Sequence, residues 1–417
     1  MINVNDFSGR TDNEILENAI KNKQADGIVV IPPRKSNMDF ERDYWLIDRA
    51  ILLPENTTII MQNAKIKLSD RCRDNFFRSA NCGMGIEFPK SISNIHIRGE
   101  GLCILEGADR PRATGDGSKQ LHAPCPHLPE DICKIANWLP ADHNTPDRIT
   151  FLDIHAHSYG TDANNPNESH YGDWRGIGIL FANVQNFSVS GLKIVKPHGW
   201  ALSFEACSYG KIERIQFDAT MHREIDGMLM NMENQDGIDI RNGCHNIMIT
   251  DITGQTGDDV VALTAIANSD YRPGGTVKNT HVMHNDWSKR ERDIHDIIIQ
   301  NVTAHSYLCH IVRLLPASSK IYNIVINNII DDGTNNTVGT TLDLGNSGGW
   351  GEIVSDSLKN ISISNVICNS KKAINIRNSG MTDSVITNII NKNPNCPTII
   401  VDNKDTLKNV LTNNILP

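Results

Sequence analysis

Short runs in which apolar and polar residues alternate recur from about Gly176 onward, and they constrain the fold more than any other feature. Asn, Gly and Ser separate these runs at intervals of roughly 20 to 30 residues. Alternation with a period of two is typical of strands, and its regular recurrence favours stacked coils over alternating strands and helices. The sequence therefore predicts an all-β fold, a right-handed single-stranded parallel β-helix.

The turns between the runs are rich in asparagine. Asparagine tolerates the left-handed backbone conformation, and its amide can bond to the same residue type in the next coil. A β-sandwich is the alternative fold, but hairpin signals such as Asn-Gly are rare in this sequence. The residues concerned are Asn183, Asn186, Asn301, Asn327, Asn328, Asn360 and Asn365.

The chain is expected to form one β-helix domain over residues 1–417. Residues 1–35 are predicted to form an N-terminal cap and entry strand, because a solenoid exposes its first coil. Pro, His, Asp and Asn break the periodicity over residues 109–175, which predicts an insertion that borders a cleft. Residues 176–417 are expected to form the regular coils.

The cap has the sequence of a short amphipathic helix. Thr11-Asp12-Asn13-Glu14 is typical of a capping box, and the apolar residues that follow share one helical face. Gly27 to Pro33 then predicts the first strand. The apolar residues of that face are Ile15, Leu16, Ala19 and Ile20.

Composition excludes several classes of partner. The net charge of −9 and the lack of a Lys/Arg-rich run argue against nucleic acid. No apolar run is long enough to span a membrane, and the N-terminus does not have the pattern of a secretory signal. We therefore expect no membrane partner and a cytoplasmic chain as given, or a secreted one if a signal has been removed.

The ten cysteines show no compact spacing pattern and are expected to be reduced and buried. Histidines and cysteines between His122 and Cys133 match no standard zinc spacing. The sequence predicts no metal site and no cofactor.

Three acidic residues are the strongest chemical signal. Asp236 and Asp258 lie 22 residues apart and both precede short alternating apolar runs, so they would stack on neighbouring coils. Asp259 follows directly, and Gly257 indicates a turn that lets both members of the pair face one cleft. Clustered carboxylates repel, which raises a pKa as a general acid requires. For one Asp alone, a turn residue is the simpler interpretation; the set of three suggests glycosidic-bond chemistry.

These residues also carry a resemblance to a known family. Asn234-Gln235-Asp236-Gly237-Ile238-Asp239, Thr256-Gly257-Asp258-Asp259 and Lys196-Pro197-His198-Gly199-Trp200 resemble motifs of the polygalacturonase-like glycoside hydrolases of family 28, which are right-handed parallel β-helices of the pectin-lyase-like superfamily. The resemblance is strongest between Gly176 and Ala265. It implies an inverting hydrolase in which Asp258 protonates the leaving oxygen while Asp236 and Asp259 activate water.

Further positions follow from aligning the coils with the family. The family histidine corresponds to His310, without its flanking glycines, and we expect it to hydrogen-bond Asp258; His281 is a rival by distance along the chain. The basic Arg-Ile-Lys motif falls either at Thr341 to Leu344, where Asp343 replaces a cation, or at Arg313. One positive charge is lost either way, so a neutral sugar is as plausible as galacturonate.

The resemblance thus implies Asn234 and Arg313 as substrate-binding residues. Several tryptophans, Trp174 among them, could stack on a sugar ring, and Trp200 or Trp350 is the candidate expected to bind substrate in the cleft. The leading hypothesis is a hydrolase of an oligosaccharide or pectin-like glycan, whether monomeric or oligomeric. A lyase or epimerase on the same scaffold is one alternative. The other is a glycan-binding or structural β-helix without turnover, like those of phage tails and adhesins.

Overall fold

A computed structural model describes residues 1–35, 42–109, 173–266, 281–283 and 291–416. The predicted insertion lies outside the described residues except at its two ends. Within these ranges the description omits residues 71, 73, 84, 85, 87, 220, 221, 226, 227, 232, 233, 318, 332, 334–338, 349 and 351–353.

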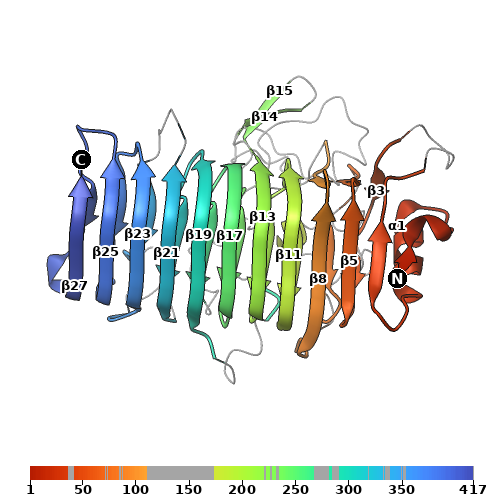
Figure 1. The fold of residues 1–417 in the computed structure, drawn as a ribbon, viewed down its shortest axis with the longest axis horizontal. Helices are drawn as coiled ribbons and strands as arrows, with labels where there is room; N and C mark the ends of the chain where they lie inside the picture. Colours follow the sequence, from red (N-terminus) through yellow and green to blue (C-terminus); the bar gives the residue numbers. More distant parts are fainter. Residues whose placement is uncertain are drawn as a thin grey trace, which may run out of the picture.

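Two parallel sheets, of fifteen and ten strands in the described part of the chain, wind around a common core. Figure 1 shows the long strands side by side in chain order from one end of the molecule to the other. The main path of the larger sheet is β1 (Ile2–Asn3), β2 (Ile28–Ile31), β5 (Thr57–Gln62), β8 (Ile92–Glu100), β11 (Val184–Val195), β13 (Ser208–Asp218), β17 (His245–Thr256), β19 (Ile294–Ser306), β21 (Ile321–Asp331), β23 (Leu358–Cys368), β25 (Met381–Asn391) and β27 (Leu407–Leu416). β3 (Trp45–Ile47), β6 (Lys65–Leu68) and β9 (Ile104–Glu106) join it at one side.

The smaller sheet consists of short strands, one from each coil. They are β4 (Ile51–Leu53), β7 (Phe77–Ser79), β10 (Ile179–Ala182), β12 (Leu202–Glu205), β16 (Ile238–Arg241), β18 (Val261–Ala265), β20 (Val312–Pro316), β22 (Thr340–Leu344), β24 (Lys372–Ile376) and β26 (Ile399–Val401). A separate antiparallel hairpin pairs β14 (His222–Ile225) with β15 (Met228–Asn231). The fold is the right-handed parallel β-helix that the sequence predicts.

Isoleucines in register form the core between the sheets. Ile249, Ile299, Ile326, Ile363 and Ile386 occupy paired positions on five successive long strands, and all are fully buried. Burying one such side chain contributes about 1.5–3 kcal/mol. Each coil buries its inward side chains against the neighbouring coils. The same pattern of inward-facing apolar residues must therefore repeat along the chain.

The long strands turn corners at left-handed residues. Asp296 and Asn301 within β19 have φ values of 56° and 54°, and the register with β17 and β21 skips both positions. Amides bridge the coils there: Asn328 Nδ2 donates to Asn301 Oδ1 at 2.8 Å, and Asn301 Nδ2 donates to Asp251 Oδ1 at 3.1 Å. The predicted asparagine turns are confirmed except at Asn327, which is not left-handed and accepts the amide of Asn365 at 2.9 Å.

Helix α1 (Asp12–Lys21) covers the first coils and packs against β3 and β4 (Figure 1). Thr11 accepts the Glu14 backbone N–H at 3.2 Å, and Glu14 returns a contact to the backbone N–H of Arg10. The predicted cap is confirmed, because all four apolar residues of its inner face are buried. The strand at Gly27–Pro33 is β2 rather than the first, since β1 precedes and pairs with it.

Short 3-10 helices occur at Val4–Asp6, Asp173–Gly176 and Lys404–Thr406. Within the described ranges, no helix is both long and apolar enough to cross a membrane.

Candidate active site

A cavity of about 270 Å³ opens on the outer side of the short-strand sheet at β16, β18 and β20. Alternation along β16 points Ile238 and Ile240 into the core and Asp239 and Arg241 toward the cavity. The lining residues are Trp200, Asn234, Asp236, Asp239, Arg241, Asp258, Asp259, Ala262, Thr264, Ile266, Cys309, Arg313, Leu315 and Trp350.

The three sequence-predicted acids meet in this cavity. Asp236 precedes β16, and Asp258 and Asp259 precede β18 on the next coil. Backbone bonds join the two segments: the amides of Gly257 and Asp258 donate to the Gln235 carbonyl at 3.1 and 3.2 Å. The spacing of 22 residues is thus one coil of the solenoid.

Hydrogen bonds to the backbone explain how neighbouring residues Asp258 and Asp259 both face the cavity. The Asp258 carbonyl accepts the hydroxyls of Thr256 at 2.6 Å and Ser306 at 2.8 Å. Asp258 Oδ1 accepts the Asp259 amide at 3.0 Å, and Asp259 Oδ1 accepts the His310 amide at 2.9 Å. The pair therefore lies in a fixed turn before the strand starts, outside the strict alternation of β18.

Burial and mutual repulsion dominate the electrostatics. Burial, followed by the charge of Asp258, raises the pKa of both Asp236 and Asp259 well above the ordinary range. Asp239, a carboxyl not singled out from the sequence, also has a raised pKa because it is buried, although Arg241 opposes the shift. Asp236, Asp239 and Asp259 therefore retain protons to a higher pH than isolated carboxyls would.

Cys309 adds a thiol to this group. A donor atom from each of Asp258, Asp259 and Cys309 lies within 4.8 Å of the others, which is the only such grouping of metal-ligating types in the described ranges. Burial and the two carboxylates raise the pKa of the Cys309 thiol, so the sulfur stays protonated. A protonated thiol is a poor metal ligand, and we assign no metal to these residues.

His310 lies beside the acids but its ring is directed elsewhere. Its Nδ1 donates to the Thr340 carbonyl at 2.9 Å, so its Nε2 accepts from Arg313 Nη1 at 3.1 Å. Burial lowers the pKa of the ring, which fits the neutral form. The expected hydrogen bond from this ring to Asp258 is therefore wrong; the contact with the acid pair runs through the backbone amide to Asp259.

The two alignments of the basic motif place it at Asp343 or at Arg313, and these two residues form an ion pair. Arg313 on β20 and Asp343 on β22 are register partners, and Arg313 Nη1 donates to Asp343 Oδ2. Arg377 Nε at 2.8 Å and Asn375 Nδ2 at 2.9 Å also bond Asp343, which is fully buried. Of these residues, only Arg313 reaches the cavity lining.

Two tryptophans contribute to the lining. Trp200 is half-buried and carries the Arg241 guanidinium 4.9 Å above its ring centroid. Trp350 comes from the loop after β22, and Asn234 reaches the lining from a left-handed turn with φ 52°. Trp174 instead packs under Arg78 and is buried.

The sequence interpretation missed a buried pair behind the cavity. Glu205 on β12 is fully buried and accepts His281 Nδ1 at 2.7 Å and the Val282 amide at 3.0 Å. Burial would raise the pKa of Glu205, but His281 and Arg241 outweigh it and hold the pKa below its ordinary range. The period-two pattern of β16 could have revealed Arg241; no local signal links Glu205 to His281, 76 residues away.

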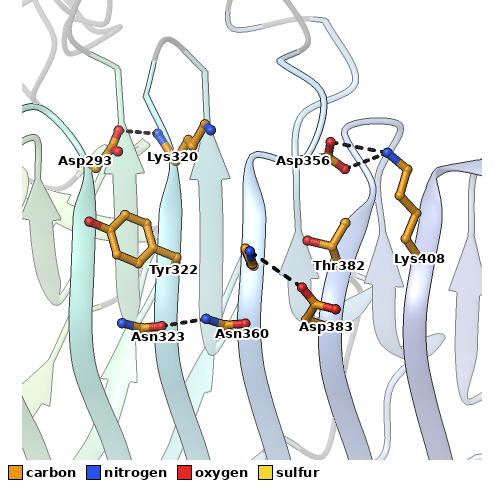
Figure 2. A pocket seen from close by; sticks show the side chains of 10 residues that line it. Asp293, Lys320, Tyr322, Asn323, Asp356, Asn360, Thr382, Asp383 and Lys408 are labelled. Carbon is orange, nitrogen blue, oxygen red and sulfur yellow. Dashed lines mark hydrogen bonds and ion pairs between the residues drawn. The ribbon is translucent and has the colours of Figure 1, made fainter.

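A larger groove of about 650 Å³ lies on the outer face of the long-strand sheet (Figure 2). Four of its charged residues form two ion pairs, Lys408 with Asp356 at 2.9 Å and Lys359 with Asp383 at 3.6 Å. Tyr322 lies at its edge, where it stacks on the His295 ring with centroids 4.9 Å apart. Volume alone would favour this groove, but the clustered carboxyls with raised pKa values place the candidate site in the smaller cavity.

Fold and site together define a right-handed parallel β-helix that carries a cluster of carboxyls in a cavity on its short-strand sheet. The sequence profile of the glycosyl hydrolases of family 28 matches residues 164–289. The resemblance inferred from the motifs is thereby confirmed. The matched segment contains Asp236, Asp258 and Asp259 but neither His310 nor Arg313, whose roles depend on geometry alone.

Solved structures support the same fold. The polygalacturonase from Erwinia carotovora is 12% identical with a TM-score of 0.55, and the match covers 100% of this chain and 94% of that one. The exopolygalacturonase from Thermotoga maritima is 15% identical with a TM-score of 0.51, covering 99% and 92%. The tailspike of E. coli bacteriophage HK620, solved with a pentasaccharide, is 12% identical with a TM-score of 0.50, covering 99% and 66%. A search of curated protein sequences found no significant match.

Proposed function

We propose that this chain hydrolyses a glycosidic bond in an oligosaccharide or pectin-like glycan with inversion at the anomeric carbon. The observation that carries this proposal is the meeting of Asp236, Asp258 and Asp259 in one aromatic-walled cavity. Burying several carboxyls together is unfavourable, so their retention points to chemistry. The similarity to family 28 over the segment that holds all three acids supports the same reaction class.

Asp258 is the proposed general acid, and Asp236 and Asp259 are the proposed base that activates water. Asp258 is more exposed than either of the other two, as a group that delivers a proton to a bound sugar must be. The raised pKa values of Asp236 and Asp259 indicate that the cluster holds protons; the proposed mechanism requires that, with the sugar bound, one of these protons lies on Asp258 and an ionised oxygen remains on Asp236 or Asp259. Trp200 and Trp350 offer rings against which a sugar can stack.

The first experiment incubates the protein with acidic and neutral oligosaccharides and follows the products by NMR. Cleavage with an inverted anomeric configuration supports the proposal, and retention contradicts the assigned mechanism. The Asp258→Asn variant should lose turnover by at least about a hundredfold. The Asp356→Asn variant, which removes a surface carboxylate from the outer groove, is the matched control and should cleave as the parent does.

An activated aryl glycoside separates the acid from the base. Its leaving group departs without a proton, so Asp258→Asn should recover turnover on that substrate, whereas Asp236→Asn and Asp259→Asn should not. Recovery in an Asp236→Asn or Asp259→Asn variant would reassign the acid. An unsaturated sugar product would instead indicate a lyase, and saturable binding without turnover would indicate a glycan-binding β-helix.

A further inference from the structure

The cations of the cavity are already matched by buried carboxylates. Among the described lining residues, the positively charged ones are Arg241 from β16 and Arg313 from β20. They lie on either side of the strand that follows Asp258 and Asp259. Each has a fully buried carboxylate on an adjacent strand of the same sheet: Glu205 on β12 beside Arg241, and Asp343 on β22 beside Arg313.

The Arg313 arrangement is the more completely defined of the two. Its Nη1 is directed away from the cavity to Asp343 and to the His310 ring. Asp343 is also bonded by Arg377 and Asn375, so its position is fixed from three sides. Burial would raise the pKa of Asp343, but the charges of Arg313 and Arg377 and the hydrogen bond from Asn375 outweigh it and lower the pKa, which favours the ionised carboxylate. Arg313 is thus held by a permanent counter-charge.

In this orientation Arg313 can still donate hydrogen bonds to an uncharged ligand. Among the described residues, its Nε and Nη2 have no protein partner, and the side chain stays partly exposed at 16%. These N–H groups can donate to sugar hydroxyls, which bring no negative charge into the cavity. A carboxylate would gain less here than from an unpaired guanidinium, because Asp343 already takes the charge-assisted contact.

Arg241 is neutralised in a similar way. Its guanidinium is buried under the Trp200 ring, and the negative charge of Glu205 on the adjacent strand acts on it. Glu205 in turn is held ionised by His281 and by Arg241. The basic charge at this side of the cavity is therefore balanced before any ligand arrives.

The four aspartates of the lining determine how the cavity interacts with a charged ligand. Asp236, Asp239, Asp258 and Asp259 face the space that a sugar would occupy, and among the described lining residues carboxyls outnumber cations. Among the described lining residues no cation without a buried carboxylate beside it is available to a uronate, which would either meet ionised acids or force the cluster to take up a further proton. Repulsion from ionised acids and the cost of further protonation both oppose binding of the charged ligand, so the cavity discriminates against it.

We infer that the cavity selects a neutral saccharide, and that Asp343, by holding Arg313 as a paired cation, determines this preference. This inference rests on the proposed function for the identity of the ligand class, since it takes the cavity to be the sugar site. It assigns to Asp343 a specificity role through Arg313, not a contact with the reacting atoms.

The experiment uses ligand pairs that differ only in charge: oligogalacturonides and their fully methyl-esterified forms, and glucuronic-acid oligosaccharides with their carboxyl-reduced counterparts. Binding of each member to the parent protein is measured by calorimetry, and cleavage is measured separately. The parent should bind the neutral member of at least one pair about tenfold more tightly than its acidic counterpart. A preference for the acidic member overturns the inference, even if that member is cleaved and the proposed hydrolysis stands.

The Asp343→Asn variant tests the residue itself. Removing this counter-charge while keeping a hydrogen-bonding amide should shift the ratio of neutral to acidic affinity by about tenfold toward the acidic member. Asp356→Asn makes the same change of net charge in the outer groove and should leave the ratio unchanged. Equal ratios in the Asp343→Asn variant and the parent would show that Asp343 does not determine the preference.

The remaining outcomes separate the two proposals. Selective binding of the neutral member without cleavage supports the selection and contradicts hydrolysis. Absence of binding to every pair overturns the selection. If Asp343→Asn does not fold, the parent's ratio across the pairs still decides whether the cavity prefers neutral sugars.

Discussion

Replacing Asp259 with asparagine should make the protein more stable while abolishing turnover. Asp259 is buried at 6% exposure, and its carboxyl oxygen accepts the His310 amide, a bond that the Asn Oδ1 can keep. The new amide N–H can donate to the neighbouring Asp258. The substitution therefore removes a repelling charge with little change in shape or hydrogen bonding.

The size of the effect follows from the geometry of the acid pair. Oxygens of Asp258 and Asp259 that lie within 4.8 Å would repel by about 3 kcal/mol if both were ionised, at an effective dielectric constant of about 20. The folded protein relieves part of this by keeping a proton, and the loss of attraction to Arg313 offsets another part. We expect a net gain of about 1–2 kcal/mol at pH 7.5.

The gain should depend on pH in a defined direction. The folded-state pKa of Asp259 is raised above its unfolded value by burial and by Asp258. A carboxyl of this kind does not destabilise the fold below its unfolded pKa, and it removes stability as the pH rises from there through the folded pKa. The difference between variant and parent should therefore be small near pH 4 and grow toward pH 7.5.

Differential scanning calorimetry at several pH values measures this difference. A gain of 1–2 kcal/mol corresponds to a rise in Tm of roughly 1–2 °C in a chain of 417 residues. The control Asp356→Asn, in an exposed pair with Lys408, should change stability by less than about 1 kcal/mol at any of these pH values. A lower Tm for Asp259→Asn at pH 7.5, or a gain independent of pH, would refute the electrostatic reasoning.

Three further predictions concern the turns and the cavity wall. Gly254→Ala should destabilise the fold by more than about 3 kcal/mol, because φ is 99° and the new Cβ would lie 2.0 Å from the Phe217 carbonyl oxygen. Urea unfolding measures this loss. The control Gly339→Ala, whose Cβ would meet nothing closer than 3.9 Å, should leave the free energy of unfolding nearly unchanged. Asn301→Ala should cost about 2–3 kcal/mol, from left-handed strain together with lost amide bonds, and Asn301→Gly about 1 kcal/mol because only the bonds are lost; equal losses in urea unfolding would contradict this division. Trp200→Ala should raise KM about tenfold with kcat little changed, and Trp200→Phe should restore most of the affinity; a fall in kcat alone would argue against a stacking platform.

The sequence was sufficient for the fold because each coil repeats the same physical requirements. Inward positions need apolar side chains in register, as in the stack that runs from Ile249 to Ile386, and corners need residues that tolerate positive φ. Both requirements leave a local pattern that can be read without knowing the neighbours in space. Asn327 shows where the pattern is ambiguous, since only Asn328 of that adjacent pair is left-handed.

The site was only partly accessible from sequence. The sequence allowed us to predict that Asp236 and Asp258 lie together, because their separation equals one coil. Asp259 could be added because a turn precedes it. The direction of the His310 ring could not be foreseen, because it depends on an arginine and a carbonyl of other strands. Glu205 and His281 likewise meet through segments with no common repeat.

The same stacking that stabilises the coils explains why the acid cluster is conspicuous. In-register stacking places like beside like, which suits isoleucine in the core and asparagine at the corners. Charged residues cannot follow that rule without repulsion, and Arg313 accordingly lies beside Asp343. Asp236, Asp258 and Asp259 are the exception, since two adjacent coils bring carboxyls together and burial increases the cost. The fold could separate these carboxyls by shifting one residue, yet it keeps them together. Their joint position is therefore better explained by the proposed reaction than by the stability of the fold.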